Sequence, residues 1–207
     1  MSTITATFPT PQPGNSPPPD LYRITVDEYE RIEERLDDPR LELISGYLVK
    51  RTDRKPPHVL TTERLRRRLD RMVPPTCFMR EDKPVRIPDF DEPFPDVSVV
   101  SGDPETYADH HPGPADVALL IEVAEFSLDR DRTEKSTAYA RGRIPVYWIV
   151  NLVDRRVEVY SNPGPDGCLS REDFLPGQEI PVLIGGVEIG RIPVAEILPY
   201  DGTRTLP

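Results

Sequence analysis

Apolar residues recur at helical spacing in two segments, residues 26–36 and 58–73, and this pattern predicts two amphipathic helices. Thr25 followed by Glu28 is the signature of a capping box, which indicates that the first helix begins there. A third helix is expected over residues 131–141, because Gly142 and Pro145 would end it.

Strand patterns fill the remaining chain. Residues 41–44 and 47–52 flank Ser45-Gly46 and predict a hairpin. Further strands are expected at 77–87, 97–100, 117–123, 146–150 and 157–160, followed by short strands to about 192 and a helical turn at 194–198. The nearly continuous apolar run 117–123 is typical of a central strand buried on both faces. The order predicts an α/β (mixed α+β) fold with a mixed central sheet flanked by helices and a β-rich C-terminal part.

The ends of the chain lack these patterns. Residues 1–20 are rich in Pro, Ser and Thr, so we expect a disordered tail, a single domain over residues 21–200 and a C-terminal tail over 201–207. The first 20 residues have no basic start and no apolar core, so we do not expect them to be a secretory signal, and no apolar run reaches the roughly 20 residues that span a bilayer. Cys77 and Cys168 match no metal-ligand spacing and are expected to be reduced. These features predict a cytoplasmic protein without a membrane partner.

Two carboxylates stand out by their position. Asp96 follows Pro95 at the start of a predicted strand, and Glu122 lies near the end of the most apolar strand. An ionised carboxylate beside such an apolar run costs free energy unless a partner compensates it. A divalent cation is one such partner, and an arginine or a helix N-terminus is another. The two residues alone leave these alternatives open.

The order of several motifs resembles the PD-(D/E)XK nuclease core, in which an Asp and a Glu on adjacent strands hold a metal ion. Here Pro95-Asp96 and Glu122-Val123-Ala124 carry that resemblance. The wider sequence, from about residue 24 to 198, resembles one family of that superfamily, described as putative restriction endonucleases. The matching stretches are residues 41–49, 58, 95–97, 121–124, 131–132, 135, 139–140 and 144–151.

The resemblance implies a metal-dependent endonuclease that hydrolyses DNA. Asp96, Glu122, the backbone carbonyl of Val123 and Glu42 would be ligands of Mg²⁺ or Mn²⁺, and Asp96, Glu122, Glu42 and Lys135 would form the catalytic set. Glu42 could equally be an exposed strand residue. The resemblance also implies a homodimer as the assembly.

The lysine departs from the superfamily pattern. That pattern has it two residues after the glutamate, where this chain has Ala124, so the resemblance assigns the role to Lys135. Its amine would orient or activate water and stabilise charge on the phosphate. An ordinary ion pair with Asp131, four residues earlier, is the alternative. Phe126 is expected near the site and, with the missing strand lysine, motivates a second interpretation, a catalytically silent binding or accessory module.

The net charge of −10 disfavours strong nonspecific binding to nucleic acid, but it permits a local basic face. Basic residues between 50 and 55 and on the second predicted helix could form such a face, or the helix could be merely solvated. The candidate nucleic-acid contacts are His58, Arg64, Arg67, Arg68 and Arg71, although His58 also suits a capping or packing role. His110 and His111 are adjacent and should diverge, so we do not expect them to form a metal pair.

Overall fold

The computed structural model describes residues 21–33, 35, 36, 38, 40–165 and 167–199. The tails expected at 1–20 and 201–207 lie outside these residues. Within the described part of the chain, the longest helices are too short and too polar to cross a bilayer. Both cysteines are free, as expected.

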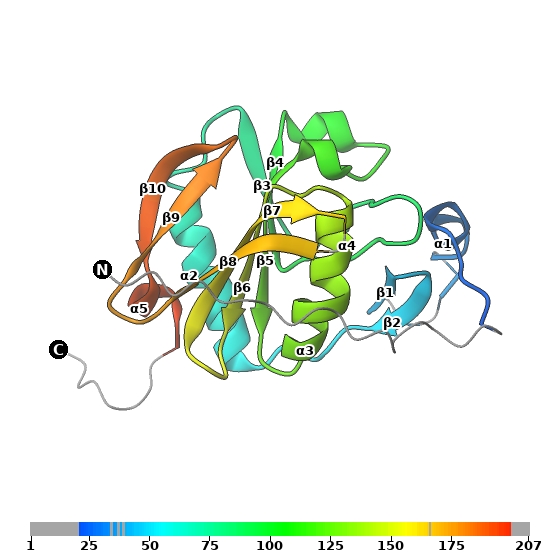
Figure 1. Ribbon diagram of the computed structural model, residues 1–207. Helices are drawn as coiled ribbons and strands as arrows, with labels where there is room; N and C mark the ends of the chain where they lie inside the picture. Colours follow the sequence, from blue (N-terminus) through cyan, green and yellow to red (C-terminus); the bar gives the residue numbers. More distant parts are fainter. Residues whose placement is uncertain (1–20, 34, 37, 39, 166, 200–207) are drawn as a thin grey trace.

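A six-stranded sheet forms the centre of the molecule (Figure 1). Its strands follow the chain order: β3 (Cys77–Glu81), β4 (Val97–Ser101), β5 (Val117–Ala124), β6 (Val146–Asn151), β7 (Arg156–Gly164) and β8 (Gly167–Phe174). β5 and β6 are parallel and the other neighbours are antiparallel, so the sheet is mixed. The predicted fold class is confirmed.

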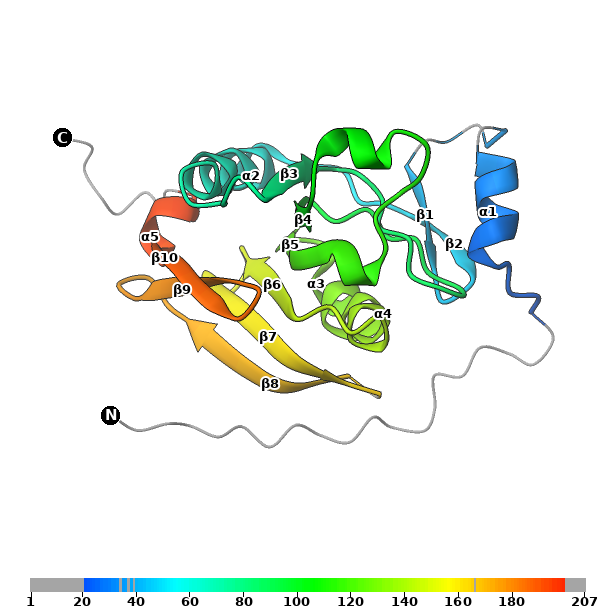
Figure 2. The same ribbon diagram turned by 90° about the horizontal axis from the view of Figure 1, so that it is seen from above.

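Helices cover both faces of this sheet. Helix α2 (Pro56–Leu69) lies on one side, and a continuous helical segment lies on the other (Figure 2). That segment contains α3 (Leu128–Arg130), a π-helical turn η3 (Asp131–Lys135) and α4 (Ser136–Arg141).

All eight residues of β5 are buried, as its apolar run predicted, with Leu119 and Ile121 packed on the α2 side and Leu120 on the α4 side. Glu122 therefore points to the α4 side, because side chains alternate along a strand.

Two smaller units, each with its own two-stranded sheet, flank the central sheet (Figure 1). On one side are α1 (Val26–Glu33) and the hairpin β1 (Leu41–Ile44) and β2 (Tyr47–Lys50). On the other side are the hairpin β9 (Glu179–Ile184) and β10 (Val187–Pro193) and the short α5 (Val194–Ile197), which complete the β-rich C-terminal part. Two 3₁₀ turns, η1 (Pro104–Tyr107) and η2 (Pro114–Asp116), interrupt the loop before β5.

Local sequence signals explain several boundaries. The capping box is confirmed, because the Thr25 N–H donates to Glu28 Oε2 at 2.8 Å and the Glu28 N–H donates to Thr25 Oγ1 at 3.2 Å. The strand expected over 77–87 ends at Glu81, since a turn follows and Pro84 cannot donate to a strand ladder. The third helix begins at Leu128, three residues before the expected start, and its π-helical turn had no signal in the apolar pattern.

Candidate active site

Lys135 is the centre of a buried polar cluster at one end of the sheet. Its Nζ lies 2.9 Å from Glu122 Oε1 and 3.1 Å from Glu42 Oε2. The lysine comes from η3, Glu122 from β5 and Glu42 from β1, and all three side chains are buried. The Tyr139 hydroxyl, one turn further along the helix, also donates to Glu122 Oε1 at 2.7 Å. The structure thus brings together three of the four residues predicted to be catalytic.

Asp96 lies immediately before β4 and is held by three donors. The Val123 backbone N–H donates to its Oδ2 at 2.7 Å, which fixes the carboxylate against the end of β5. His58 Nε2 lies 3.1 Å from the same oxygen, and Arg54 Nη2 donates to Oδ1 at 2.9 Å. His58 therefore lies beside a predicted site residue. It is not the N-cap of α2, since that position is Lys55, whose side chain makes no capping hydrogen bond.

Asp131 is a fourth buried acid of the site, and the sequence argument missed its place there. The Ser127 hydroxyl donates to Asp131 Oδ2 at 2.6 Å, whereas Asp131 Oδ1 is buried without a hydrogen-bond partner. Lys135 forms its ion pairs across the fold with Glu122 and Glu42, and not along its own helix as the alternative interpretation supposed. π-Helical turns are rare and are frequent at functional sites. This one directs Asp131 and Lys135 into the same cluster.

The surrounding charges shift the pKa of each group. Burial raises the pKa of Glu122 well above its usual range; Lys135 opposes this effect, and the other acids add to it. Burial likewise raises the pKa of Asp131 to about 6. Burial alone would lower the pKa of Lys135, but the neighbouring carboxylates outweigh it, so the pKa is raised and the ammonium stays protonated. The pKa of Asp96 is lowered in spite of burial, because His58, the Val123 N–H and Arg54 stabilise its charged form.

A cleft of about 220 Å³ opens onto this cluster. The acids Glu42, Asp96, Glu122 and Asp131 line it, together with Lys135 and His58. Arginines line the same cleft: Arg40, Arg51, Arg54 and Arg130. Arg54 and Arg51 also pair with Asp82, which lies in the turn after β3. The cleft therefore combines buried carboxylates with arginines, three of which pair with Asp53 or Asp82 in the same lining.

The predicted arginine face of α2 lies elsewhere. Arg64, Arg67, Arg68 and Arg71 are not among the residues that line the cleft. Arg64 donates to the carbonyl of Leu198, Arg68 pairs with Glu196 of α5, and Arg67 pairs with Glu63 on its own helix at 3.1 Å. Arg71 is exposed. Helical spacing placed these side chains outward correctly, but it gave no information on which face of the domain they would occupy.

Phe126 does not fill the cleft. Its side chain is 65% exposed, and the residue is not part of the cleft lining. The large ring that the sequence argument expected near the site therefore leaves access to the carboxylates open.

The acids of the cleft are separated by basic groups. The Lys135 ammonium lies within 3.1 Å of both Glu42 and Glu122, and Arg54 and His58 hold Asp96. Among the described residues, one group of three acid or histidine side chains has possible ligand atoms that all lie within 4.8 Å of one another. This group consists of Glu33, Glu92 and His111, and it lies outside the cleft. Apart from the His58 imidazole, which contacts Asp96, the possible ligands in the cleft are carboxylate oxygens and backbone carbonyls, which Mg²⁺ and Mn²⁺ prefer.

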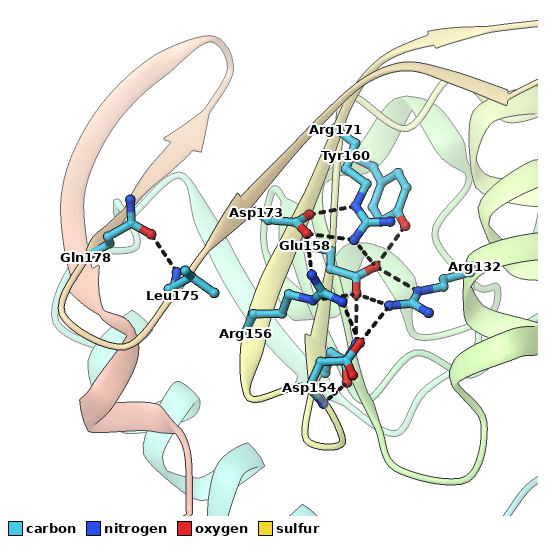
Figure 3. Close-up of polar contacts among 10 residues, drawn as sticks. Arg132, Asp154, Arg156, Glu158, Tyr160, Arg171, Asp173, Leu175 and Gln178 are labelled. Carbon is cyan, nitrogen blue, oxygen red and sulfur yellow. Dashed lines mark hydrogen bonds and ion pairs between the residues drawn. The ribbon is translucent and has the colours of Figure 1, made fainter. Parts of the chain in front are cut away.

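A second buried network holds the π-helical turn against the sheet (Figure 3). Glu158 of β7 is fully buried and accepts a hydrogen bond from Arg132 Nε at 3.0 Å, from Asn151 Nδ2 at 2.8 Å and from the Tyr160 hydroxyl at 2.9 Å. Arg171 Nη2 lies 3.3 Å from the same carboxylate. Arg132 belongs to η3, so this network fixes the turn that carries both Asp131 and Lys135.

A comparison with known protein families gives a match over most of the chain. Residues 26–191 match the sequence model of the Uma2 family, which is described as "Putative restriction endonuclease". The chain belongs to this family. The Uma2 match covers α1, the whole central sheet and most of β10, so it includes every residue of the cluster described above. No curated protein matches the sequence.

A solved structure shares the fold of this Uma2 chain. It is the crystal structure of a putative nuclease of the DUF820 group from Anabaena variabilis ATCC 29413. The two chains are 15% identical, the TM-score is 0.65, and the match covers 84% of this chain and 97% of the other. Family and fold together support a nuclease function in general terms.

Proposed function

We propose that this protein is a metal-dependent endonuclease that hydrolyses DNA phosphodiester bonds. The observation that carries the proposal is the convergence of Glu42, Asp96, Glu122 and Lys135 on one cleft from four separate segments of the chain. Residues 21–200 would form the nuclease-like domain, with tails at 1–20 and 201–207.

The donor set fits a divalent cation. Four buried carboxylates line the cleft, and the basic groups in contact with them are Lys135, Arg54 and His58. Asp131 Oδ1 is buried without a partner, so negative charge is left that these groups do not compensate. Asp96, Glu122, the Val123 carbonyl and Glu42 would hold Mg²⁺ or Mn²⁺, and the cation would have to displace part of the basic contacts. When bound, it would lower the pKa of a water molecule and polarise a phosphoryl oxygen.

The chain's own residues have separate tasks in this proposal. Lys135 stays protonated beside its carboxylates, so it serves as a hydrogen-bond donor that orients water and stabilises charge on the phosphate, and not as a proton acceptor. Glu122 and Glu42 position the ammonium. Arg54 contacts Asp96 from the more exposed side of the cleft. A phosphate of the substrate could replace Asp96 there as the partner of the Arg54 guanidinium.

The arginines of the cleft bear on the objection from net charge. Arg40, Arg51 and Arg130 line the same cleft as the acids, so phosphates of the DNA backbone could replace Asp53 and Asp82 as partners of the Arg40 and Arg51 guanidinium groups. The α2 arginines, which the sequence suggested for this role, are not needed. A homodimer with two such clefts and a cytoplasmic location are the assembly and setting expected for this family.

A catalytically silent binding module is the second candidate function. The specific observation in its favour is that both oxygens of Asp96 already have partners, in Arg54, His58 and the Val123 N–H. If these contacts persist when substrate binds, Asp96 is not available to a cation.

The test combines metal binding with cleavage. Mg²⁺ and Mn²⁺ binding is measured by titration calorimetry, and cleavage is measured on supercoiled plasmid, linear DNA and RNA. The wild type should bind the cation and nick DNA, whereas Asp96→Asn and Glu122→Gln should lose both activities and keep a cooperative thermal transition. Cation and DNA binding without cleavage by any preparation would favour the silent module. Full cleavage by both variants would show that the site is assigned wrongly.

A further inference from the structure

Glu92 is a buried acid that the proposed nuclease site does not use. Its side chain is 0% exposed, and neither carboxylate oxygen has a hydrogen-bond partner. Its backbone is fixed, because the Glu92 N–H donates to the Leu43 carbonyl at 2.8 Å and forms a bridge to β1. An unpartnered carboxylate at this depth is costly, and native proteins rarely keep one without a compensating group.

Two further ligand atoms converge on Glu92. His111 Nε2 lies 3.7 Å from Glu92 Oε1, and one oxygen of Glu33 completes a group of three atoms that all lie within 4.8 Å of one another. Glu33 is the last residue of α1 and His111 lies in the loop before β5, and both are half-buried. The adjacent histidines diverge, as the sequence predicted: His110 is exposed and pairs with Asp109, whereas His111 turns toward Glu92.

Arg86, the arginine that acts on Glu92, is already committed to α1, while Arg80 and Lys83 lie near His111. Arg86 donates to Glu30 at 2.8 Å and to Asp27, both on α1, so its hydrogen bonds do not reach Glu92. Glu30 and Glu33 add negative charge on the same side of the cluster. Two carboxylates and one imidazole nitrogen therefore converge, and both oxygens of Glu92 lie there without a hydrogen bond.

We propose that Glu33, Glu92 and His111 bind one divalent transition-metal ion of the zinc class. A set of two carboxylates and an imidazole suits Zn²⁺ or Co²⁺, whereas Mg²⁺ prefers oxygen ligands alone, so this site and the cleft select different cations. Three protein ligands leave a position for water, which the half-exposed His111 side of the cluster can supply.

The bound ion would cross-link three segments. It would connect the end of α1, the segment that leads to Asp96 and the loop that leads to β5. Glu92 pairs with Leu43, the neighbour of Glu42, so the cross-link would stiffen the position of Glu42. The role is structural, and it does not depend on the proposed nuclease activity.

The test uses the full chain freed of metal with a chelator and then titrated with Co²⁺ alone. Visible absorption reports Co²⁺ in a site with a nitrogen ligand, and competition with Zn²⁺ gives the zinc affinity. Glu92→Gln and His111→Gln are compared with two controls, His110→Gln in the same loop and Glu122→Gln in the cleft. His111 is part-exposed on a loop, so its variant should fold normally, and a thermal melt of each protein checks this.

One equivalent of Co²⁺ should bind to the site of Glu33, Glu92 and His111 with the same spectrum in the wild type and both controls, and Zn²⁺ should raise their melting temperatures. Any second equivalent bound in the cleft should be lost only in Glu122→Gln. Glu92→Gln and His111→Gln should weaken this binding by more than about tenfold and lose the thermal shift. Absence of Co²⁺ binding to the wild type, or equal binding by the His111 variant, would overturn the proposal. Loss only in Glu122→Gln would mean that the ion binds in the cleft. None of these results changes the Mg²⁺ and cleavage tests of the nuclease site.

Discussion

Lys135 Nζ lies 2.9 Å from Glu122 Oε1, although the two residues are 13 positions apart and belong to different elements. The lysine reaches the glutamate because η3 packs on the α4 side of the sheet, the side to which Glu122 points. The helix thus supplies the amine that the superfamily pattern places at position 124 of the strand. Because both groups are buried, the loss of Lys135 would leave Glu122 with the Tyr139 hydroxyl but without its cation.

Replacing Lys135 with Met should lower both stability and activity. In the presence of EDTA, we expect the free energy of unfolding to fall by about 3–5 kcal/mol, since Glu42 and Glu122 would remain buried without their cation. Mg²⁺ should recover part of this loss, because the carboxylates would gain another positive partner. Cleavage should fall by at least about 100-fold.

Urea denaturation with and without Mg²⁺ measures the change in stability. Lys55→Met is the matched control, since Lys55 is exposed at the start of α2, and it should change neither stability nor cleavage. An equal loss of stability for Lys135→Met in EDTA and in Mg²⁺ would argue against a cation beside Glu122.

Arg54→Gln should separate metal binding from substrate binding. The Arg54 guanidinium lies 2.9 Å from Asp96 Oδ1, so its removal should raise the affinity for Mg²⁺. The gain should be only a few-fold, since Arg54 is about one-third exposed and water screens its charge. Binding to DNA should weaken, because a phosphate contact is lost. Calorimetry and fluorescence anisotropy measure the two affinities, and a fall in both would mean that Arg54 mainly supports the fold.

The sequence predicted the parts of the site that short motifs carry. Glu42, Asp96 and Glu122 each stand at a fixed position relative to a strand, so strand patterns and the family resemblance were enough to select them. Arg54 was predicted only as part of a basic face and not as a partner of Asp96, and Asp131 was missed as a site residue. The contact of Arg54 with Asp96 joins residues 42 positions apart, and the position of Asp131 depends on a π-helical turn that leaves no periodic signal.

The α2 arginines were predicted as nucleic-acid contacts, but they do not line the cleft. Their spacing correctly indicated the outer face of a helix, but it could not show that α5 returns to α2 and places Glu196 beside Arg68. Glu92 and His111 lie 19 positions apart in irregular segments, where neither helical nor strand spacing applies, so the sequence offered no reason to join them.

Glu158 should make the free energy of unfolding depend on pH in the acid range. Burial would raise the pKa of Glu158, but hydrogen bonds from Arg132 and Asn151 outweigh burial, so the pKa lies below its usual value. A carboxyl with a lowered pKa stabilises the fold fully above its ordinary pKa of about 4.3, and this contribution is lost as the pH falls through the lower folded-state pKa.

Glu158→Gln should therefore be less stable than the wild type at pH 7, by roughly 1–3 kcal/mol, and the difference should shrink toward pH 3. Because Arg132 belongs to η3, cleavage at neutral pH should also fall while the enzyme stays folded. Chemical denaturation from pH 3 to pH 8 measures the difference, with the exposed Glu172→Gln as control. A difference that stays constant over this range would show that Glu158 keeps one protonation state throughout.

The path of DNA across the surface can be tested with two arginines. Arg130 lines the cleft, whereas Arg67 is 73% exposed on the outer face of α2 and pairs with Glu63. If DNA follows the cleft, Arg130→Gln should weaken binding to all sequences and reduce the slope of log K against log salt by about 1, since one phosphate contact is lost. Arg67→Gln should leave the slope unchanged.

Binding is measured by anisotropy on one duplex at several salt concentrations, with Ca²⁺ in place of Mg²⁺ to suppress cleavage. A reduced slope for Arg67→Gln with a normal slope for Arg130→Gln would instead place the DNA along α2, and the cleft would then receive only the strand that is cut.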